Sequence, residues 1–145
     1  MAKYLGILLA FVLSTSAFAE QEKSADRAAI EAAVMDYFDG QGEASAERLN
    51  RAFARDVVSM VAATKNDQGV VELRAFKDMG PVLDRWAANG NPPGAGRDHE
   101  ILDMHIQDGR IATVVFRYAD RFYDALTLIK IDGEWKIVAK AFVEQ

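Results

Sequence analysis

Cysteine is absent from the 145-residue chain, which also has only three prolines and two histidines. Without cysteine the protein has no disulfide bond, no thiol nucleophile and no thiolate ligand for a metal. Half of the residues are hydrophobic and only ten are glycine, which is typical of a globular domain rather than a disordered chain. The chain also lacks a nucleophile elbow, a phosphate-binding loop and the glycine pattern of a dinucleotide-binding fold.

Basic side chains are the minority among the charged residues. The chain has 17 Lys and Arg against 22 Asp and Glu, a formal net charge of -5. An acidic surface repels polyanions, so we expect neither nucleic acid nor an anionic membrane as a partner.

The first 19 residues have the three parts of a secretory signal peptide. Lys3 supplies the positive start, residues 5–13 form an apolar run, and Ala17-Phe-Ala19 is a small-x-small cleavage site before Glu20. The alternative is an N-terminal membrane anchor, but the run is short for a bilayer. We therefore predict an exported protein, periplasmic or secreted, with residues 1–19 removed and residues 20–145 forming one domain without membrane contact. Loss of Lys3 would leave 16 basic and 22 acidic side chains, a net charge of -6.

Helices are predicted in the first part of this domain. A helix capped by Ser24, with Asp26 in its first turn, is expected to run to the glycines at 40 and 42. A second is expected to start at Ser45, and a third over residues 77–88 with Pro81 in its first turn. Short strands are expected at 57–62 and 70–74. The apolar positions of the first helix recur at helical spacing: Ile30, Ala33, Val34, Tyr37 and Phe38.

The second part of the domain contains two strand–turn–strand patterns, with Asp-Gly turns at 108–109 and 132–133. Two-residue turns set the pairing within each hairpin. The expected pairs are His99 with Tyr118, Glu100 with Arg117, Asp103 with Val114, Lys130 with Trp135, Leu128 with Ile137, Leu126 with Ala139, and Ala125 with Lys140. Helices followed by an antiparallel meander predict an α+β fold with N-terminal helices packed on a curved, mainly antiparallel sheet.

Several segments resemble a known superfamily. They are Tyr37-Phe38-Asp39-Gly40, the Leu49/Phe53 pair, residues 97–102, and above all the closing hairpin over residues 121–142 with Asp132-Gly133-x-Trp135. This set resembles the cone-shaped α+β domains of the nuclear-transport-factor-2-like superfamily, in its branch labelled "putative lumazine-binding". The resemblance implies a pocket between the helices and the concave sheet face, and a homodimer formed through the sheet. The superfamily includes isomerases, dehydratases and proteins that only bind or assemble, so the fold does not select a function.

One set of candidate catalytic residues lies on the predicted strand 99–107. His99, Asp103 and His105 are expected on one face, and an Asp near His99 could orient it as a general base. The two histidines are six residues apart, roughly 20 Å along a strand, so they cannot share a metal ion and no metal site is predicted. His99 with Tyr118 is a second candidate, as a proton-transfer pair. A polar edge or a dimer contact is the structural alternative.

Asp124 is the other catalytic candidate. It is expected to share a face with Leu126, Leu128, Trp135, Ile137, Ala139 and Ala141, and the two alanines would leave room for a ligand. A buried carboxyl group can act as a general acid or base. The structural alternative is a hydrogen bond to a backbone group or a pair with Arg121.

The remaining candidates are ligand-binding residues. Tyr37 and Tyr123 could donate hydroxyl hydrogen bonds, Asp103 could accept one, and Trp86 and Trp135 could line a pocket, although aromatic residues at such positions are often packing residues. The leading hypothesis is non-covalent binding of a small organic molecule, without a cofactor. A cofactor-independent isomerase, dehydratase or hydrolase using Asp124, His99 or Tyr118 is the first alternative, so enzymatic activity stays open. An accessory or assembly protein with a filled pocket is the second.

Overall fold

The computed structural model of the protein describes residues 5–89 and 98–145. These residues form three helices and six strands in the order α1 (Leu5–Gly42), α2 (Ala46–Ala52), β1 (Ser59–Lys65), β2 (Val71–Phe76), α3 (Gly80–Asn89), β3 (His99–Gln107), β4 (Ile111–Tyr118), β5 (Phe122–Ile131) and β6 (Glu134–Glu144). In these parts of the chain, no helix combines the length and the apolar character needed to cross a membrane.

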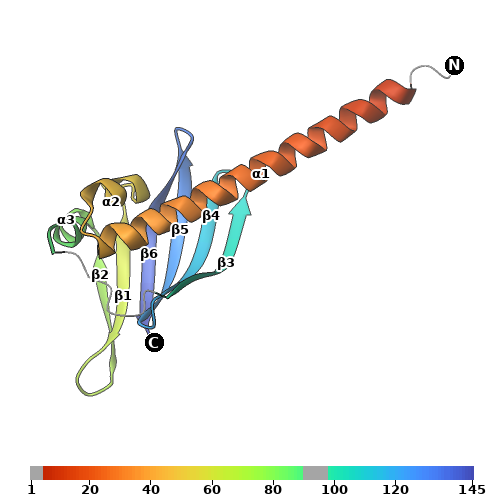
Figure 1. The fold of residues 1–145 in the computed structure, drawn as a ribbon. Coiled ribbons are helices and arrows are strands. Elements are labelled where there is room, and N and C mark those ends of the chain that lie inside the picture. The colour runs from red at the N-terminus through yellow and green to blue at the C-terminus, as the bar shows by residue number, and fades with distance from the viewer. Residues whose placement is uncertain (1–4, 90–97) are drawn as a thin grey trace.

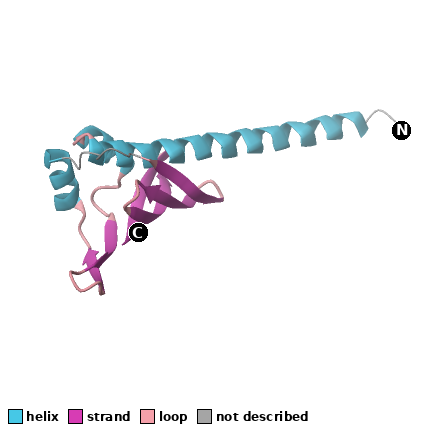
Figure 2. Ribbon diagram, turned by 60° about the horizontal axis from the view of Figure 1, so that its bottom comes forward, coloured by secondary structure: helices cyan, strands magenta, loops and turns pink. Residues whose placement is uncertain are grey.

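The strands form one sheet in the order β2-β1-β6-β5-β4-β3. Every neighbouring pair is antiparallel except β1 and β6, which run parallel. The sheet is curved, and the helices lie along one of its faces (Figures 1 and 2). The predicted α+β architecture is therefore confirmed, and the parallel β1–β6 pair joins the N-terminal strands to the predicted meander.

Helix α1 is longer than the sequence indicated. It is one continuous helix from Leu5, because no glycine or proline interrupts the chain between Gly6 and Gly40. The predicted start at Ser24 is wrong, and Asp26 lies in mid-helix, where it is the first buried residue whose side chain is described. The part of α1 before this point extends past the edge of the sheet (Figure 1).

The apolar stripe of α1 forms the centre of the core. Ile30, Val34 and Phe38 are each at most 2% exposed and pack over the concave face of the sheet.

The other two helices begin close to where the sequence predicted. Ser45 Oγ accepts a hydrogen bond from the backbone N–H of Arg48 at 3.3 Å and caps α2, and Pro81 lies in the first turn of α3.

Both Asp-Gly turns form tight hairpins, but only the second is the predicted two-residue turn. Ile131 pairs with Glu134 there, whereas Gln107 pairs with Ile111 and leaves residues 108–110 in the first turn. Asp108 and Gly109 have φ of 57° and 61°, and Asp132 and Gly133 have φ of 50° and 86°. Two consecutive left-handed residues are the signature of a type I′ turn, whose twist matches that of the strands.

The predicted pairing is right near the final turn and wrong further away. Lys130 faces Trp135 and Leu128 faces Ile137, but Thr127 then pairs with Ala139. Val138 is therefore an extra residue in β6, a β-bulge that moves every later residue of the strand to the opposite face. Leu126 consequently pairs with Lys140 instead of Ala139, and Ala125 with Ala141 instead of Lys140.

A second bulge lies in β3. His99 pairs with Tyr118 and Glu100 with Arg117 as predicted, but Asp103 pairs with Val115 and His105 with Thr113. Leu102 is the extra residue. The expectation that His99, Asp103 and His105 share one face is therefore wrong.

Candidate functional site

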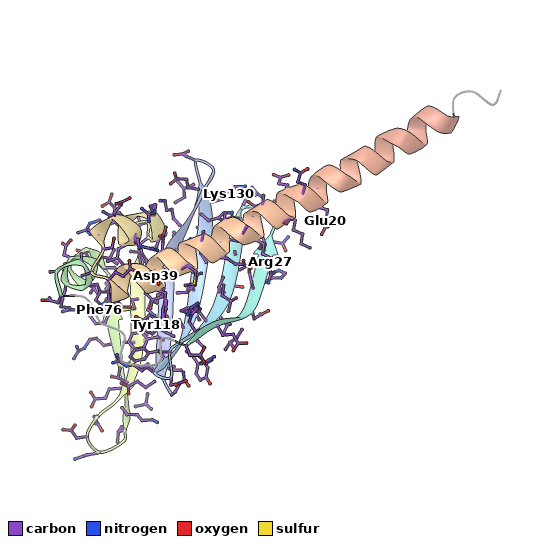
Figure 3. All side chains as sticks on the ribbon, viewed as in Figure 1. Glu20, Arg27, Asp39, Phe76, Tyr118 and Lys130 are labelled. Carbon is purple, nitrogen blue, oxygen red and sulfur yellow. The ribbon has the colours of Figure 1, made fainter. Side chains whose placement is uncertain are left out.

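A cavity of about 290 Å³ opens between the C-terminal part of α1, helix α3 and the strands β1, β2, β5 and β6. Its apolar walls come from Met60, Phe76, Val82, Trp86, Phe122 and Phe142. Its polar groups come from Tyr37, Gln41, Thr64, Arg74, Arg85 and Lys140. Phe76, at the end of β2 beside α3, marks this end of the molecule in Figure 3.

A buried polar cluster lies where the cavity meets the sheet. The Nζ atom of Lys140 is 2.5 Å from Oδ1 of Asp124, and the side chains of this pair are 3% and 0% exposed. The hydroxyl of Tyr37 donates a hydrogen bond of 2.8 Å to Oδ2 of the same carboxylate. Lys140 and Tyr37 line the cavity, so Asp124 contacts its interior through these two side chains.

Burial sets the protonation of this cluster. It raises the pKa of the Tyr37 phenol well above its usual range, and the negative charge of Asp124 adds to the effect, so the hydroxyl stays a proton donor at neutral pH. Burial also lowers the pKa of the Lys140 ammonium, while the charge and hydrogen bond of Asp124 partly oppose this shift. The ammonium further faces the rings of Phe142 and Tyr37, at 4.8 and 5.1 Å from their centroids.

Lys140 was missed in the sequence because simple alternation places it on the outer face. The bulge at Val138 instead turns it toward Asp124. The sequence does contain a signal for the bulge. In a regular strand the residues on one face all have odd or all have even numbers, but the inner side of β6 carries the odd-numbered Trp135 and Ile137 and the even-numbered Phe142. Large apolar residues that change parity within one strand indicate an inserted residue.

Two further missed residues line the mouth of the cavity. Arg74 comes from β2, where it pairs with the buried Ala62, and Arg85 comes from α3. Both are exposed. Isolated exposed arginines on a short edge strand and on a helix carry no sequence signal, because only the placement of α3 against α1 and α2 brings them to one opening.

Three of the predicted residues belong to this site. Tyr37 and Trp86 line the cavity, with their rings 6.0 Å apart. Asp124 lies behind them, paired with Lys140 and not with Arg121 as considered from the sequence. Tyr118 is buried with its ring 5.8 Å from that of Tyr37, which places it next to the cluster (Figure 3).

The other predicted residues lie elsewhere. Asp103 and Tyr123 are on the outer face of the sheet, and Tyr123 is 41% exposed. Trp135 is buried, but its Nε1–H donates a 2.9 Å hydrogen bond to Oδ1 of Asp26, which also accepts a 2.7 Å bond from Lys130. This second cluster fastens the closing hairpin to α1 away from the cavity, and Lys130 is labelled there in Figure 3.

His99 has a different surrounding from His105. Both side chains are exposed, but the ring of His99 packs 4.7 Å from that of Phe38, whereas His105 lies on the outer face. Among the residues that the structure describes, no three His, Asp or Glu side chains are grouped so as to hold a metal ion.

Solved structures with this architecture come from several bacteria. An NTF2-like protein of unknown function from Shewanella baltica is 18% identical, with a TM-score of 0.67 over 84% of this chain and 95% of that one. Another from Silicibacter pomeroyi is 20% identical, with a TM-score of 0.65 over 85% and 98% of the two chains. A third, from Methylobacillus flagellatus, is 22% identical, with a TM-score of 0.64 over 83% and 93%. At these identities the likeness establishes the fold alone.

No curated protein matches the chain. The family model described as "Putative lumazine-binding" does match it, over residues 25–143. This range contains the cavity, the Asp124 cluster and all six strands. The chain belongs to this "Putative lumazine-binding" family, with the fold of the NTF2-like superfamily.

Proposed function

We propose that the protein binds a small organic molecule, non-covalently, in the cavity between α1, α3 and the sheet. The observation that carries the proposal is the composition of this cavity: aromatic walls around a few polar groups, with a hydrogen-bonded ion pair already in place at its base. Ligand sites are typically concave, mostly apolar and furnished with a small number of positioned polar groups. The family description, which names lumazine binding, and a volume of about 290 Å³ are both compatible with a ligand of a few rings.

The accessory alternative requires a pocket filled by the protein's own side chains. The cavity argues against it, because large residues such as Phe76, Phe122 and Phe142 stand around the space instead of closing it. A purely structural core of this size would be expected to pack to high density.

Native mass spectrometry of the protein purified from its own host tests the proposal. We expect a reproducible additional mass on the wild type and its loss in Ala62→Phe, which puts a ring on the cavity wall. Ala75→Phe, on the next strand but exposed on the opposite face, is the matched control and should keep the ligand. Equal retention of the same molecule by both variants would exclude this cavity as the binding site.

Acid–base catalysis is the second candidate, favoured by one observation. The Asp124 carboxylate is shared by two groups at the cavity wall, the Tyr37 hydroxyl and the Lys140 ammonium. Such an arrangement lets a proton move between a bound molecule and Lys140 or Tyr37 while Asp124 balances the charge. Once a ligand is known, Tyr37→Phe should abolish its turnover and change its dissociation constant by less than about fivefold. If Tyr37→Phe turned over the ligand as fast as the wild type, the acid–base role would be excluded and non-covalent binding would remain the proposed function.

Export is proposed on the sequence of residues 1–19, and the structure adds a supporting fact. The described side chains from Ala19 to Ala25 are exposed, and burial begins at Asp26. Cleavage before Glu20 would therefore leave the core intact. The intact mass of the protein from an exported fraction checks this: the mass of residues 20–145 supports export, and a full-length mass contradicts it.

A homodimer through the outer face of the sheet is proposed as well. Val115, Ala125, Ala141 and Val61 form a row across β4, β5, β6 and β1 on the face that no described helix covers. Both valines in this row are about 40% exposed, at 38% and 42%. Val115→Glu should convert a dimer to a monomer in sedimentation analysis, whereas Val70→Glu, in the exposed β1–β2 loop, should not. A wild-type monomer at high concentration would contradict the proposal.

A further inference from the structure

The charge of the cavity is opposite to that of the protein. The chain carries more acidic than basic residues, 22 against 17. Yet the cavity is lined by Arg74, Arg85 and Lys140, and no carboxylate is among the described residues that line it. A basic pocket in an acidic protein is a local feature that the overall composition does not produce.

The three cations are not equivalent. Lys140 is buried at the base, where Asp124 already balances its charge. Arg74 and Arg85 are exposed and reach the opening from two different elements, β2 and α3. The unbalanced positive charge therefore lies at the mouth, and the paired charge lies at the base.

Acidic residues close to these two arginines in sequence are engaged elsewhere. Glu72 accepts a 2.8 Å hydrogen bond from Asn66, and Asp84 pairs with Arg55 at 2.6 Å. Asp78 Oδ1 accepts the backbone N–H of Gly80 at 2.8 Å. These three carboxylates are therefore engaged with other groups, and among the residues that the structure describes none of them forms an ion pair with Arg74 or Arg85.

The space behind the arginines suits a flat, apolar body. Trp86, Phe76 and Phe122 come from three different elements and all line the cavity. Ring stacking and edge contacts favour a planar aromatic ligand over a flexible aliphatic one.

We infer that the ligand is a small aromatic carboxylic acid, bound with its ring among Trp86, Phe76 and Phe122 and its carboxylate at Arg74 and Arg85. This inference rests on the proposed binding function and adds the chemical class of the ligand. Arginine suits the carboxylate because its planar guanidinium donates two parallel hydrogen bonds to the two oxygens. The Lys140–Asp124 pair then offers a polar contact to a substituent at the far end of the ring.

The expected effects follow from the exposure of the arginines. An exposed charged contact is weaker than a buried one, so we expect each of Arg74→Gln and Arg85→Gln to weaken binding about fivefold, and the double variant about 20-fold. Binding should also weaken as salt is raised, because screening acts on charges near the surface. Arg110→Gln removes the same charge at the exposed β3–β4 turn and is the matched control, with no expected effect.

The experiment compares two probes of equal shape, 2-naphthoate and its neutral analogue 2-naphthylmethanol, by isothermal titration calorimetry on the purified protein. We expect naphthoate to bind at least tenfold more tightly than the alcohol and to lose that advantage in the double arginine variant but not in Arg110→Gln. Equal affinity for both probes, unaffected by the arginine substitutions, would overturn the anionic assignment while leaving a small-molecule pocket. Binding of neither probe would overturn the aromatic-acid assignment, and the mass-spectrometric comparison of Ala62→Phe with Ala75→Phe would then decide the binding function separately.

Discussion

Replacement of Lys140 by Met is the most direct test of the cluster at the base of the cavity. The substitution keeps the length and apolar stem of the side chain but removes the ammonium that lies 2.5 Å from Asp124. Asp124 is 1% exposed, so its carboxylate would remain buried with only the hydrogen bond from Tyr37. A buried charge that loses its partner is strongly unfavourable.

The size of the effect follows from the burial of both partners. Breaking a buried ion pair from one side typically costs about 3–5 kcal/mol of unfolding free energy. Adding Asp124→Asn to Lys140→Met removes the stranded charge and leaves an amide oxygen to accept from Tyr37. We therefore expect the double variant to be more stable than Lys140→Met alone, by about 2 kcal/mol.

Urea denaturation followed by circular dichroism measures these differences. A loss of about 4 kcal/mol corresponds to a shift of the midpoint by about 2 M for a domain of this size. Lys136→Met is the matched control on the same strand, because its ion-pair partner Glu134 is exposed, and it should cost about 1 kcal/mol or less. If Lys140→Met were as stable as that control, or if the second substitution destabilised it further, the buried pair would not exist as described.

Three further outcomes are expected. Asp26→Asn should destabilise the protein by about 2–3 kcal/mol at neutral pH, since it weakens the bonds from Lys130 and Trp135. Burial alone would raise the pKa of the Asp26 carboxyl, but these two bonds and the charge of Lys130 hold the pKa below its ordinary value. The stability difference between the wild type and Asp26→Asn should therefore be complete above about pH 4 and disappear as the pH falls through the folded-state pKa. A difference that stayed constant in unfolding measured across this pH range would contradict the assignment. Gly133→Ala should cost about 1–2 kcal/mol in thermal unfolding through backbone strain alone, because φ is 86° and an added Cβ meets nothing within 4 Å. Ser45→Ala should cost about 1 kcal/mol by removing the cap of α2, and a neutral effect would show that the 3.3 Å bond to the Arg48 N–H contributes little.

The local features of this fold were predictable because each depends on neighbouring residues alone. The apolar spacing of Ile30, Val34 and Phe38 defines the buried side of α1, and the Asp-Gly turns define the positions of two hairpins. The predicted pairing is correct next to the second turn, whereas next to the first turn it is shifted by one residue. The start of α1 was missed, because Ser24 is a good cap but nothing before it stops the helix. Among the site residues, Tyr37 and Trp86 were found because aromatic residues on helix stripes must face the sheet.

The sequence by itself determined the class of fold, the hairpins and the inward position of Asp124, since these follow from periodicity and turn chemistry over a few residues. The partner of Asp124 was decided only by tertiary structure. One inserted residue, Val138, reverses the facing of the rest of β6, and whether a strand takes such a bulge depends on how both faces pack across the whole sheet. The basic mouth was decided in the same way, because Arg74 and Arg85 belong to separate elements, and only the placement of α3 against α1 and α2 brings both to one cavity.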